Sequence, residues 1–191
     1  MNSQLILASG SPRRRELLSV ITQDFKVVVS DAEEYIAPGT PPWQAVEQLA
    51  EQKAQAVFAS NPQSVVIGSD TVVALGEDIL GKPADEADAK RMLACLSGKR
   101  HTVYTGVAVL GPNVRRVFHC ATAVEFYPLT QEEIAWYVST GEPMDKAGAY
   151  GIQGQGSLLV KGIQGDYFNV MGFPVAEVAR ALWSSGIVAK Y

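Results

Sequence analysis

The sequence is poor in the residues that build disulfide scaffolds and zinc sites. It has 2 cysteines and 2 histidines among 191 residues, with neither a C-x-x-C pair nor the His and Cys spacing of a zinc site. These features exclude a disulfide framework and favour a protein of a reducing compartment. We therefore expect His101 and His119 to be structural.

Long hydrophobic runs and net positive charge are also lacking. No stretch reaches the roughly 18 apolar residues of a membrane-spanning helix, and no signal-peptide pattern opens the sequence. The formal net charge is −4, whereas general nucleic-acid binders carry a basic face that displaces counterions. We therefore expect a cytoplasmic protein without membrane or nucleic-acid partners, although a local basic pocket remains compatible with this charge.

The remaining composition is that of a globular protein, with 47% hydrophobic and 19% charged residues. Apolar runs bounded by turn residues predict strands over 4–8, 25–29, 65–69, 102–110, 115–126, 158–163 and 168–171. Helical periodicity predicts helices over 12–20, 42–60, 85–96, 130–138 and 174–183. This order indicates an α/β fold with a mixed sheet, and we expect a single domain over 1–191 with two lobes.

The most informative stretch is residues 5–18, which predicts a strand, a small-residue turn and a helix that opens with arginines. Ser9 and its neighbours leave amides and hydroxyls free near the positive end of the helix dipole, where anions bind. Arginines in a first turn oppose that dipole, so helix stability does not explain them. We interpret Arg13 and Arg14 as phosphate ligands. The alternative is an ordinary connection whose arginines point into water.

Carboxylates and a lysine could act together with these arginines in a phosphate site. Asp70 follows the apolar run 65–67, and ligands of α/β sheets bind at the carboxyl ends of strands. Glu33 and Glu34 offer a second carboxylate, and phosphate chemistry needs such groups for a metal or a water. Taken singly, these acids also fit turn, cap or solvated positions. Lys53 interrupts an apolar helix stripe, so it either extends to solvent or faces a buried anion.

Two further segments are candidates for ligand contact. Residues 76–83 (GEDILGKP) nearly match a phosphate-binding P-loop, but Pro83 replaces the hydroxyl residue that would hold Mg²⁺ and removes an amide. This excludes a P-loop and leaves Lys82 as a candidate phosphate contact. Residues 145–156 are rich in small residues that allow close backbone approach to a ligand, and the amide of Gln153 can pair with a planar base edge.

Together these segments resemble the Maf family of nucleoside triphosphate pyrophosphatases, and more closely its branch acting on dTTP and UTP. Each matching stretch is weak alone, but their order and spacing are specific. The stretches are 8–14, 33–34, 51–54, 68–71, 81–83, 96–98, 142–154, 165–167 and 170–174. Small departures are Ser69, where alanine is frequent, and Phe173, where leucine is frequent.

The resemblance implies a two-lobed mixed α/β fold with flanking helices and a central cleft, similar to inosine triphosphate pyrophosphatases. It also implies a homodimer and a divalent cation, Mg²⁺ or Mn²⁺. The position of Asp70 is that of the proton acceptor in such proteins. Arg13, Thr71 and Gln153 occupy positions associated with the preference for dTTP and UTP. By alignment, Glu34 is the member of the glutamate pair that faces the metal.

From these residue types we expect three groups of roles. Asp70 and Glu34 bind the metal, and together with Lys82 they form the catalytic set. The phosphates are held by Ser9, Arg13, Arg14 and Lys53. Two other functions remain open: a nucleotidyltransferase, which normally carries a G-x-G-x-R loop that is absent here, and a non-catalytic nucleotide sensor, which needs no carboxylates.

Overall fold

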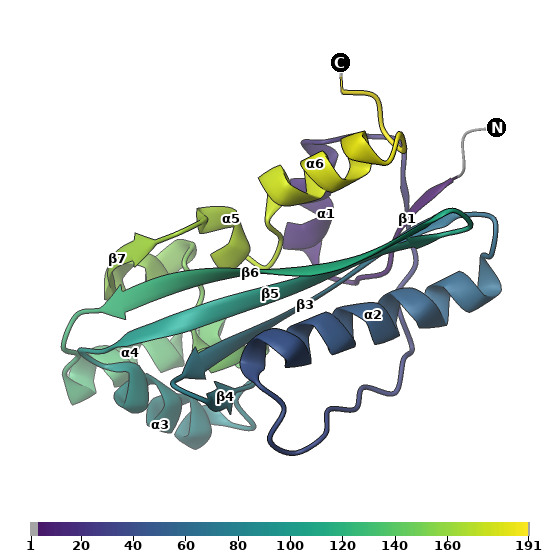
Figure 1. Ribbon diagram of the computed structural model, residues 1–191. Helices are drawn as coiled ribbons and strands as arrows, with labels where there is room; N and C mark the ends of the chain where they lie inside the picture. Colours follow the sequence, from purple (N-terminus) through teal and green to yellow (C-terminus); the bar gives the residue numbers. More distant parts are fainter. Residues whose placement is uncertain (1–3, 191) are drawn as a thin grey trace.

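The computed structural model describes residues 4–190, and within them a seven-stranded mixed sheet forms the centre of the molecule (Figure 1). The strand order is β2-β1-β3-β5-β6-β7, and β4 pairs with β3. β1 runs parallel to β2 and β3, and the other pairs are antiparallel. The strands are β1 (Leu5–Leu7), β2 (Lys26–Val27), β3 (Val65–Leu75), β4 (Asp78–Leu80), β5 (Arg100–Gly111), β6 (Val114–Phe126) and β7 (Val160–Gln164). This arrangement confirms the predicted α/β class with a mixed sheet.

Helices cover both faces of the sheet. They are α1 (Pro12–Ser19), α2 (Pro42–Ser60), α3 (Glu86–Leu96), α4 (Gln131–Ser139), α5 (Tyr167–Val170) and α6 (Val175–Ser184), with short 3-10 helices η1 (Glu142–Asp145), η2 (Ala147–Ala149) and η3 (Gly154–Leu159). The long helix α2 crosses one face, whereas α1 and α6 lie together near one end of the sheet and α3 and α4 near the other (Figure 1). No helix within residues 4–190 is long and apolar enough to span a membrane.

The two faces of the sheet bury different cores. Because side chains alternate along a strand, Val66 of β3 packs with α2, while Ile67 packs with α1 and α6. Further along, Val73 joins a separate cluster with α3 and α4. Buried polar residues, including Ser69 and Thr105, lie between these two clusters along the strands. The division into two lobes stays a prediction.

Helix α2 lies in backbone contact with the sheet at two glycines. A Cβ atom on Gly68 would lie 2.2 Å from the carbonyl oxygen of Ala50, and one on Gly106 would lie 2.1 Å from that of Val46. Only glycine permits this approach. The close packing allows Lys53, one turn along from Ala50, to reach the middle of β3.

One predicted strand is helical in the structure, and one observed strand was not predicted. The stretch 168–171, predicted as a strand, belongs mainly to the helical turn α5, because the Asp166 side chain accepts a hydrogen bond from the Phe168 amide (2.8 Å) and caps that turn. A short apolar run does not by itself distinguish a strand from a helical turn. The missed strand β4 forms a hairpin with β3, so the segment 76–83 is a hairpin and turn, in agreement with the rejection of a P-loop.

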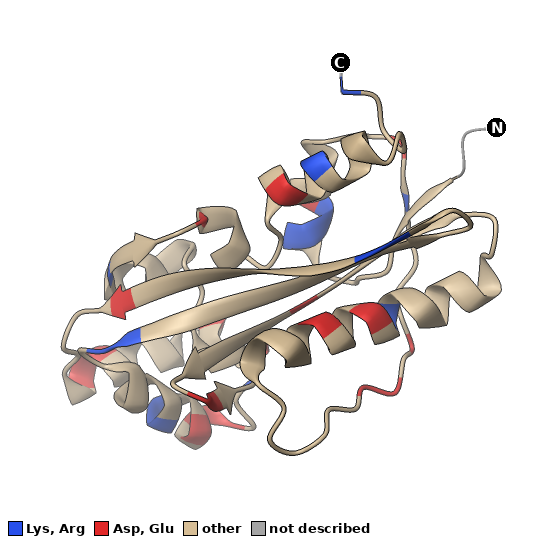
Figure 2. Ribbon diagram, in the orientation of Figure 1, with Lys and Arg blue, Asp and Glu red and all other residues tan. Residues whose placement is uncertain are grey.

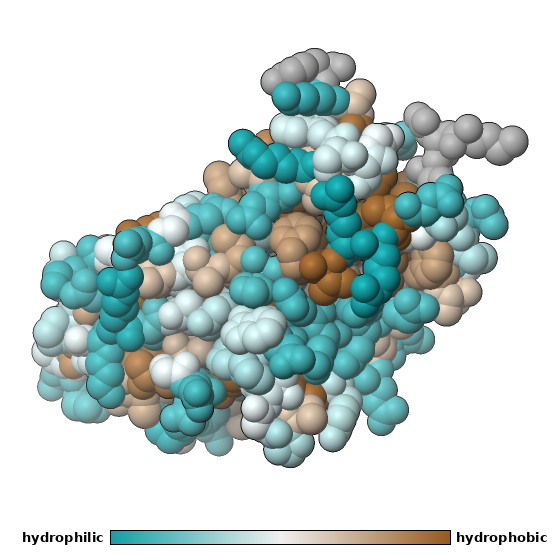
Figure 3. Space-filling model, viewed as in Figure 1, coloured by the Kyte–Doolittle hydropathy of each residue, from teal (hydrophilic) through white to brown (hydrophobic). Residues whose placement is uncertain are grey.

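Charged and hydrophobic side chains are distributed unevenly. Figure 2 shows basic positions on α1 and acidic positions on α2 and on the loop that precedes it. On the face drawn in Figure 3, hydrophilic residues surround patches of hydrophobic ones. Exposed hydrophobic side chains include Val20, Tyr35 and Trp43.

Candidate active site

A lysine between two carboxylates forms the centre of the candidate site. Nζ of Lys53 lies 2.5 Å from Oδ1 of Asp70 and 3.1 Å from Oε1 of Glu34. The side chains of Lys53 and Asp70 are 16% and 14% exposed, and that of Glu34 is 48% exposed. The three residues come from α2, from β3 and from the loop before α2. Their formal charges sum to −1, so the cluster offers a partly buried anionic site next to a fixed cation.

Asp70 does not follow a strand, as the sequence predicted, but lies in the middle of β3. The strand continues because its far half pairs with β4 and β5. The edge that faces β1 is nevertheless open here, since β1 pairs with β3 up to Ile67 and β4 pairs only from Val73 onward. Asp70 therefore lies beyond the carboxyl end of β1, where α/β sheets bind ligands.

Arg14 fills part of that open edge. Its guanidinium donates to the carbonyl oxygens of Ser69 (2.7 Å, from Nη1) and Gly172 (2.8 Å, from Nε), and from Nη2 to Oγ1 of Thr71 (3.1 Å). Burial lowers the pKa of Arg14, and the nearby Asp70 carboxylate partly offsets this effect. Arg14 does not point into water, as the alternative interpretation required. It ties α1 to β3 and to the segment before α6.

Thr71 belongs to a directional chain of hydrogen bonds on the face of β3 opposite α2. Thr105 donates to the carbonyl oxygen of Asn169 (2.9 Å). A hydroxyl has one proton, so the 2.9 Å contact between Thr71 and Thr105 is donated by Thr71. Thr71 in turn accepts from Arg14. The proton of the Thr71 hydroxyl is therefore committed within the protein.

Ser9 and Arg13 lie at the amino-terminal end of α1, as predicted. Oγ of Ser9 accepts from the amide of Ser11 (3.2 Å), so the serine shapes the turn. The Arg13 side chain is 36% exposed, and its Nη2 lies 3.9 Å from Oδ2 of Asp145 in η1. A pair at this distance and exposure holds the guanidinium weakly. Of the two arginines, Arg13 is the one available to a ligand.

Gln153 is exposed in a loop held by a residue to which the sequence gave no role. One carboxylate oxygen of Glu142 accepts from the amide of Gly156 (3.2 Å) and the hydroxyl of Tyr137 (2.9 Å), and the other accepts from the amide of Gln155 (3.0 Å). The side chain of Gln153 forms no hydrogen bond within residues 4–190. The small residues of 145–156 and the matching stretch 142–154 signalled this loop, whereas an acid reaching back to its amides has no local sequence pattern.

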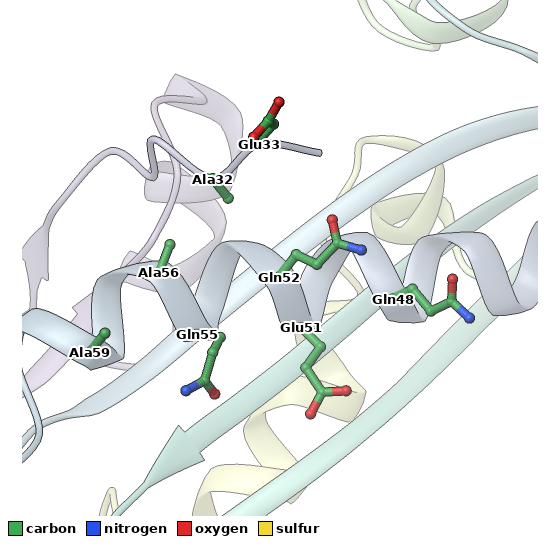
Figure 4. A pocket seen from close by; sticks show the side chains of 8 residues that line it. All are labelled: Ala32, Glu33, Gln48, Glu51, Gln52, Gln55, Ala56 and Ala59. Carbon is green, nitrogen blue, oxygen red and sulfur yellow. The ribbon is translucent and has the colours of Figure 1, made fainter. Parts of the chain in front are cut away.

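Lys82 and Glu33 lie outside the central cluster of contacts. Lys82 is exposed in the turn after β4, and within residues 4–190 its ammonium has neither a hydrogen bond nor an ion pair. The carbonyl oxygen of Gly81 accepts from the amide of Gly148 (2.9 Å), which places this turn beside η2. Glu33 lines a surface groove along α2 (Figure 4), whereas its neighbour Glu34 faces Lys53.

The carboxylates of the site suit a divalent cation such as Mg²⁺. Within residues 4–190 there is no group of three or more His, Cys, Asp and Glu residues that could hold an ion. Asp70 and Glu34 still supply two carboxylates that approach the same ammonium. Mg²⁺ commonly binds through one or two carboxylates together with water and substrate phosphates. The residues present therefore suit a cation that arrives with a triphosphate rather than one caged by protein alone.

Comparison with known proteins places this chain in a family. Residues 4–185 match the family model described as Maf-like protein. Proteins of Bacillus cereus (strain B4264) and Bacillus cytotoxicus, both named dTTP/UTP pyrophosphatase, are 51% identical over 179 residues, which is 94% of this chain and of each relative. Among solved structures, the Staphylococcus aureus Ham1 protein has a TM-score of 0.51 at 20% identity, over 66% of this chain and 73% of that one. This last likeness concerns the fold.

Proposed function

The chain belongs to the Maf-like protein family, and from that premise we propose that it hydrolyses dTTP and UTP to the nucleoside monophosphate and pyrophosphate. The names of relatives that match over 94% of the chain support this activity. The structural observation that carries it is the pairing of Asp70 and Glu34 with Lys53 beside the basic first turn of α1. Acidic groups that activate water and basic groups that hold phosphates are the two requirements of the reaction.

Asp70 is the proton acceptor in this proposal. The ammonium of Lys53 lies 2.5 Å from Oδ1 of this carboxylate and holds it in place. The oxygen of a water attacks the α-phosphorus, its proton passes to Asp70, and the bond from the α-phosphorus to the bridging oxygen breaks. That oxygen leaves with the electron pair as part of pyrophosphate. Lys53 then lies close to the charge that develops on the phosphates, where a fixed cation is most effective.

The phosphates lie against α1. Arg13 and the turn containing Ser9 supply donors, and Lys82 adds an exposed positive charge from the turn after β4. Arg14 contributes its charge from a buried position, since most of its donors bind carbonyls and Thr71. This division assigns direct phosphate contact mainly to Arg13 and a supporting electrostatic role to Arg14.

A divalent cation, Mg²⁺ or Mn²⁺, is the proposed cofactor, held by Asp70 and Glu34. When bound, such an ion neutralises phosphate charge and lowers the pKa of water.

We assign the preference for the pyrimidine base to Arg13, Thr71 and Gln153. The Gln153 amide can donate to O4 and accept from N3–H of uracil or thymine, while Thr71 acts through its fixed position.

We further propose a cytoplasmic homodimer that needs neither nucleic acid nor membrane for its activity. The exposed hydrophobic side chains leave surface available for a second copy. Sedimentation equilibrium of the purified protein tests this assembly. A mass of about twice 20.5 kDa supports the dimer, and a mass of a single chain contradicts it.

Product analysis tests the proposed reaction. Purified protein incubated with UTP and Mg²⁺, without any acceptor, is expected to yield UMP and pyrophosphate. A requirement for an acceptor would indicate a transferase, and binding without turnover would indicate a sensor.

Asp70→Asn keeps the side-chain volume but removes the basic oxygen, so turnover should fall by roughly two orders of magnitude or more with the fold retained. Near-normal turnover of this variant would remove Asp70 from the mechanism.

A further inference from the structure

The loop that carries Glu34 has little secondary structure of its own. It joins β2 to α2, and residues 28–37 contain no helix or strand. Within the described chain, the hydrogen bonds and ion pairs that link residues 30–36 to the remainder of the protein come from two neighbouring residues of α2, Gln52 and Lys53. The position of Glu34 therefore depends on this helix.

Gln52 binds the loop through both of its amide atoms. The amide N–H of Tyr35 donates to Oε1 of Gln52 (3.0 Å), and Nε2 of Gln52 donates to the carbonyl oxygen of Tyr35 (2.8 Å). The side-chain amide of Gln52 thus makes the same two hydrogen bonds to the Tyr35 backbone that a residue of a paired β-strand would make. The Tyr35 side chain is 67% exposed, so the contact fixes the backbone rather than the ring.

Neighbouring positions on both segments link this contact to the reaction. Gln52 precedes Lys53 on α2, and Tyr35 follows Glu34 on the loop. Successive residues on a helix point about 100° apart, so Lys53 reaches β3 while Gln52 reaches the loop. In Figure 4 the Gln52 side chain extends from α2 on the side where Glu33 and the loop lie.

The ion pair alone is a weak tether for the carboxylate. Glu34 is 48% exposed, and ion pairs of that exposure contribute little to order because water screens them. Two hydrogen bonds to the adjacent residue restrict the backbone and hold the carboxylate near Lys53 before any ligand binds.

We propose that Gln52 is a positioning residue that preorganises Glu34 for the divalent cation and its triphosphate. This inference rests on the proposed function, and it assigns Gln52 no contact with the substrate. When the glutamine is lost, we expect faster amide hydrogen exchange in the loop and weaker binding of the cation. The free energy of unfolding of the whole protein should not change.

The test compares Gln52→Leu with Gln55→Leu, a change at an exposed glutamine on the same helix whose side chain forms no hydrogen bond in the described chain. Hydrogen exchange of the Tyr35 amide is measured without metal or nucleotide. Loss of its hydrogen bond should accelerate exchange on the order of fivefold to tenfold in Gln52→Leu alone. Gln52→Glu, which keeps an acceptor but loses the donor, should be intermediate. Tyr35→Ala should match the wild type in activity, since it keeps both backbone groups.

Pyrophosphate release from UTP is then titrated with Mg²⁺ in the same proteins. Gln52→Leu should need roughly fivefold to tenfold more Mg²⁺ for half-maximal rate, while Gln55→Leu should not. Faster exchange with an unchanged Mg²⁺ requirement, or the converse, overturns the inference. If the wild type releases no pyrophosphate, the proposed function itself fails, and hydrogen exchange still reports whether the contact exists.

Discussion

Lys53 is the residue on which the candidate site depends most. On a helix stripe that otherwise packs against the sheet, its ammonium contacts Asp70 and Glu34 and is only 16% exposed. Burying an unpaired ammonium would be costly, so the two carboxylates are its structural counterparts as well as catalytic candidates. A single lysine thus couples α2, β3 and the loop before α2.

A buried histidine makes stability depend on pH. His101 is 2% exposed, its Nε2 lies 2.8 Å from the Tyr150 hydroxyl, and burial lowers its pKa from 6.5 to about 4. Between these values the unfolded state binds more protons, so the contribution of neutral His101 is complete above about pH 6.5 and is lost as the pH falls toward 4. The free energy of unfolding should drop by roughly 2–3 kcal/mol between pH 7.5 and 4.5 from this group.

Urea denaturation at the two pH values measures this effect in the wild type and in His101→Phe, which keeps a ring against Phe126 and Tyr150. The variant should show a smaller loss on acidification, because contributions from carboxylates are common to both proteins. Equal losses would show that His101 does not titrate differently on unfolding.

The sequence predicted residue types better than residue contacts. Asp70 was expected in the site from its position after an apolar run, Lys53 from its place on an apolar helix stripe, and Glu34 from the resemblance to the Maf family. The carbonyl contacts of Arg14, and the part that Glu142 plays in the loop, depend on partners brought together by the fold. Such contacts leave no periodic signal in the chain. The catalytic and binding roles of these residues stay predictions.

At the scale of elements, the contact between α2 and the sheet sets the geometry of the site. Gly68→Ala would put a methyl group 2.2 Å from the Ala50 carbonyl oxygen. The helix must move, at a cost of roughly 1–3 kcal/mol for overpacking, and Lys53 moves with it. We expect a lower melting temperature together with reduced turnover.

Gly162→Ala is the matched control, because an added Cβ in β7 meets no atom within 4 Å. Thermal unfolding and UTP hydrolysis of both variants check the prediction. A Gly68→Ala protein with wild-type stability and turnover would mean that α2 does not need this close approach.

The loop held by Glu142 is the second element with a consequence for function. Glu142→Leu removes the acceptors for the Gln155 and Gly156 amides, so Gln153 loses its fixed position. The Michaelis constant for UTP should rise on the order of tenfold, as hydrogen bonds to a charged group are worth roughly 1.5–3 kcal/mol. Glu142→Gln, which keeps one acceptor, should be milder. If both variants show the steady-state kinetics of the wild type, Glu142 is not needed to position Gln153 for UTP.

Element boundaries were predictable where periodicity was long. The predicted helix 42–60 and the predicted strands 102–110 and 115–126 agree with α2, β5 and β6, since each carries many residues of one pattern. The stretch 168–171 was too short to distinguish strand from helix, and the cap from Asp166 decided it. β4 was missed because only three residues, over Asp78–Leu80, pair with β3.

At the scale of the whole molecule, polar residues interrupt the core on the face of the sheet opposite α2. Ser69, Thr105 and Asn169 are buried and hydrogen-bonded between two hydrophobic clusters.

The sequence predicted a mixed sheet from its alternation of elements. The strand order depended on pairings between distant segments, such as β3 with β5, which local patterns do not encode.

Hydrolysis of pyrimidine triphosphates is the central claim, and the most direct test is kcat/KM for pyrophosphate release from UTP, dTTP, CTP, GTP and ATP by the intact protein. If Gln153 reads the base, UTP and dTTP should exceed CTP by roughly 1–3 kcal/mol in kcat/KM, about fivefold to 150-fold, with the purine nucleotides poorer still. Equal values for UTP, CTP and GTP, or no pyrophosphate from any of them, would contradict the claim.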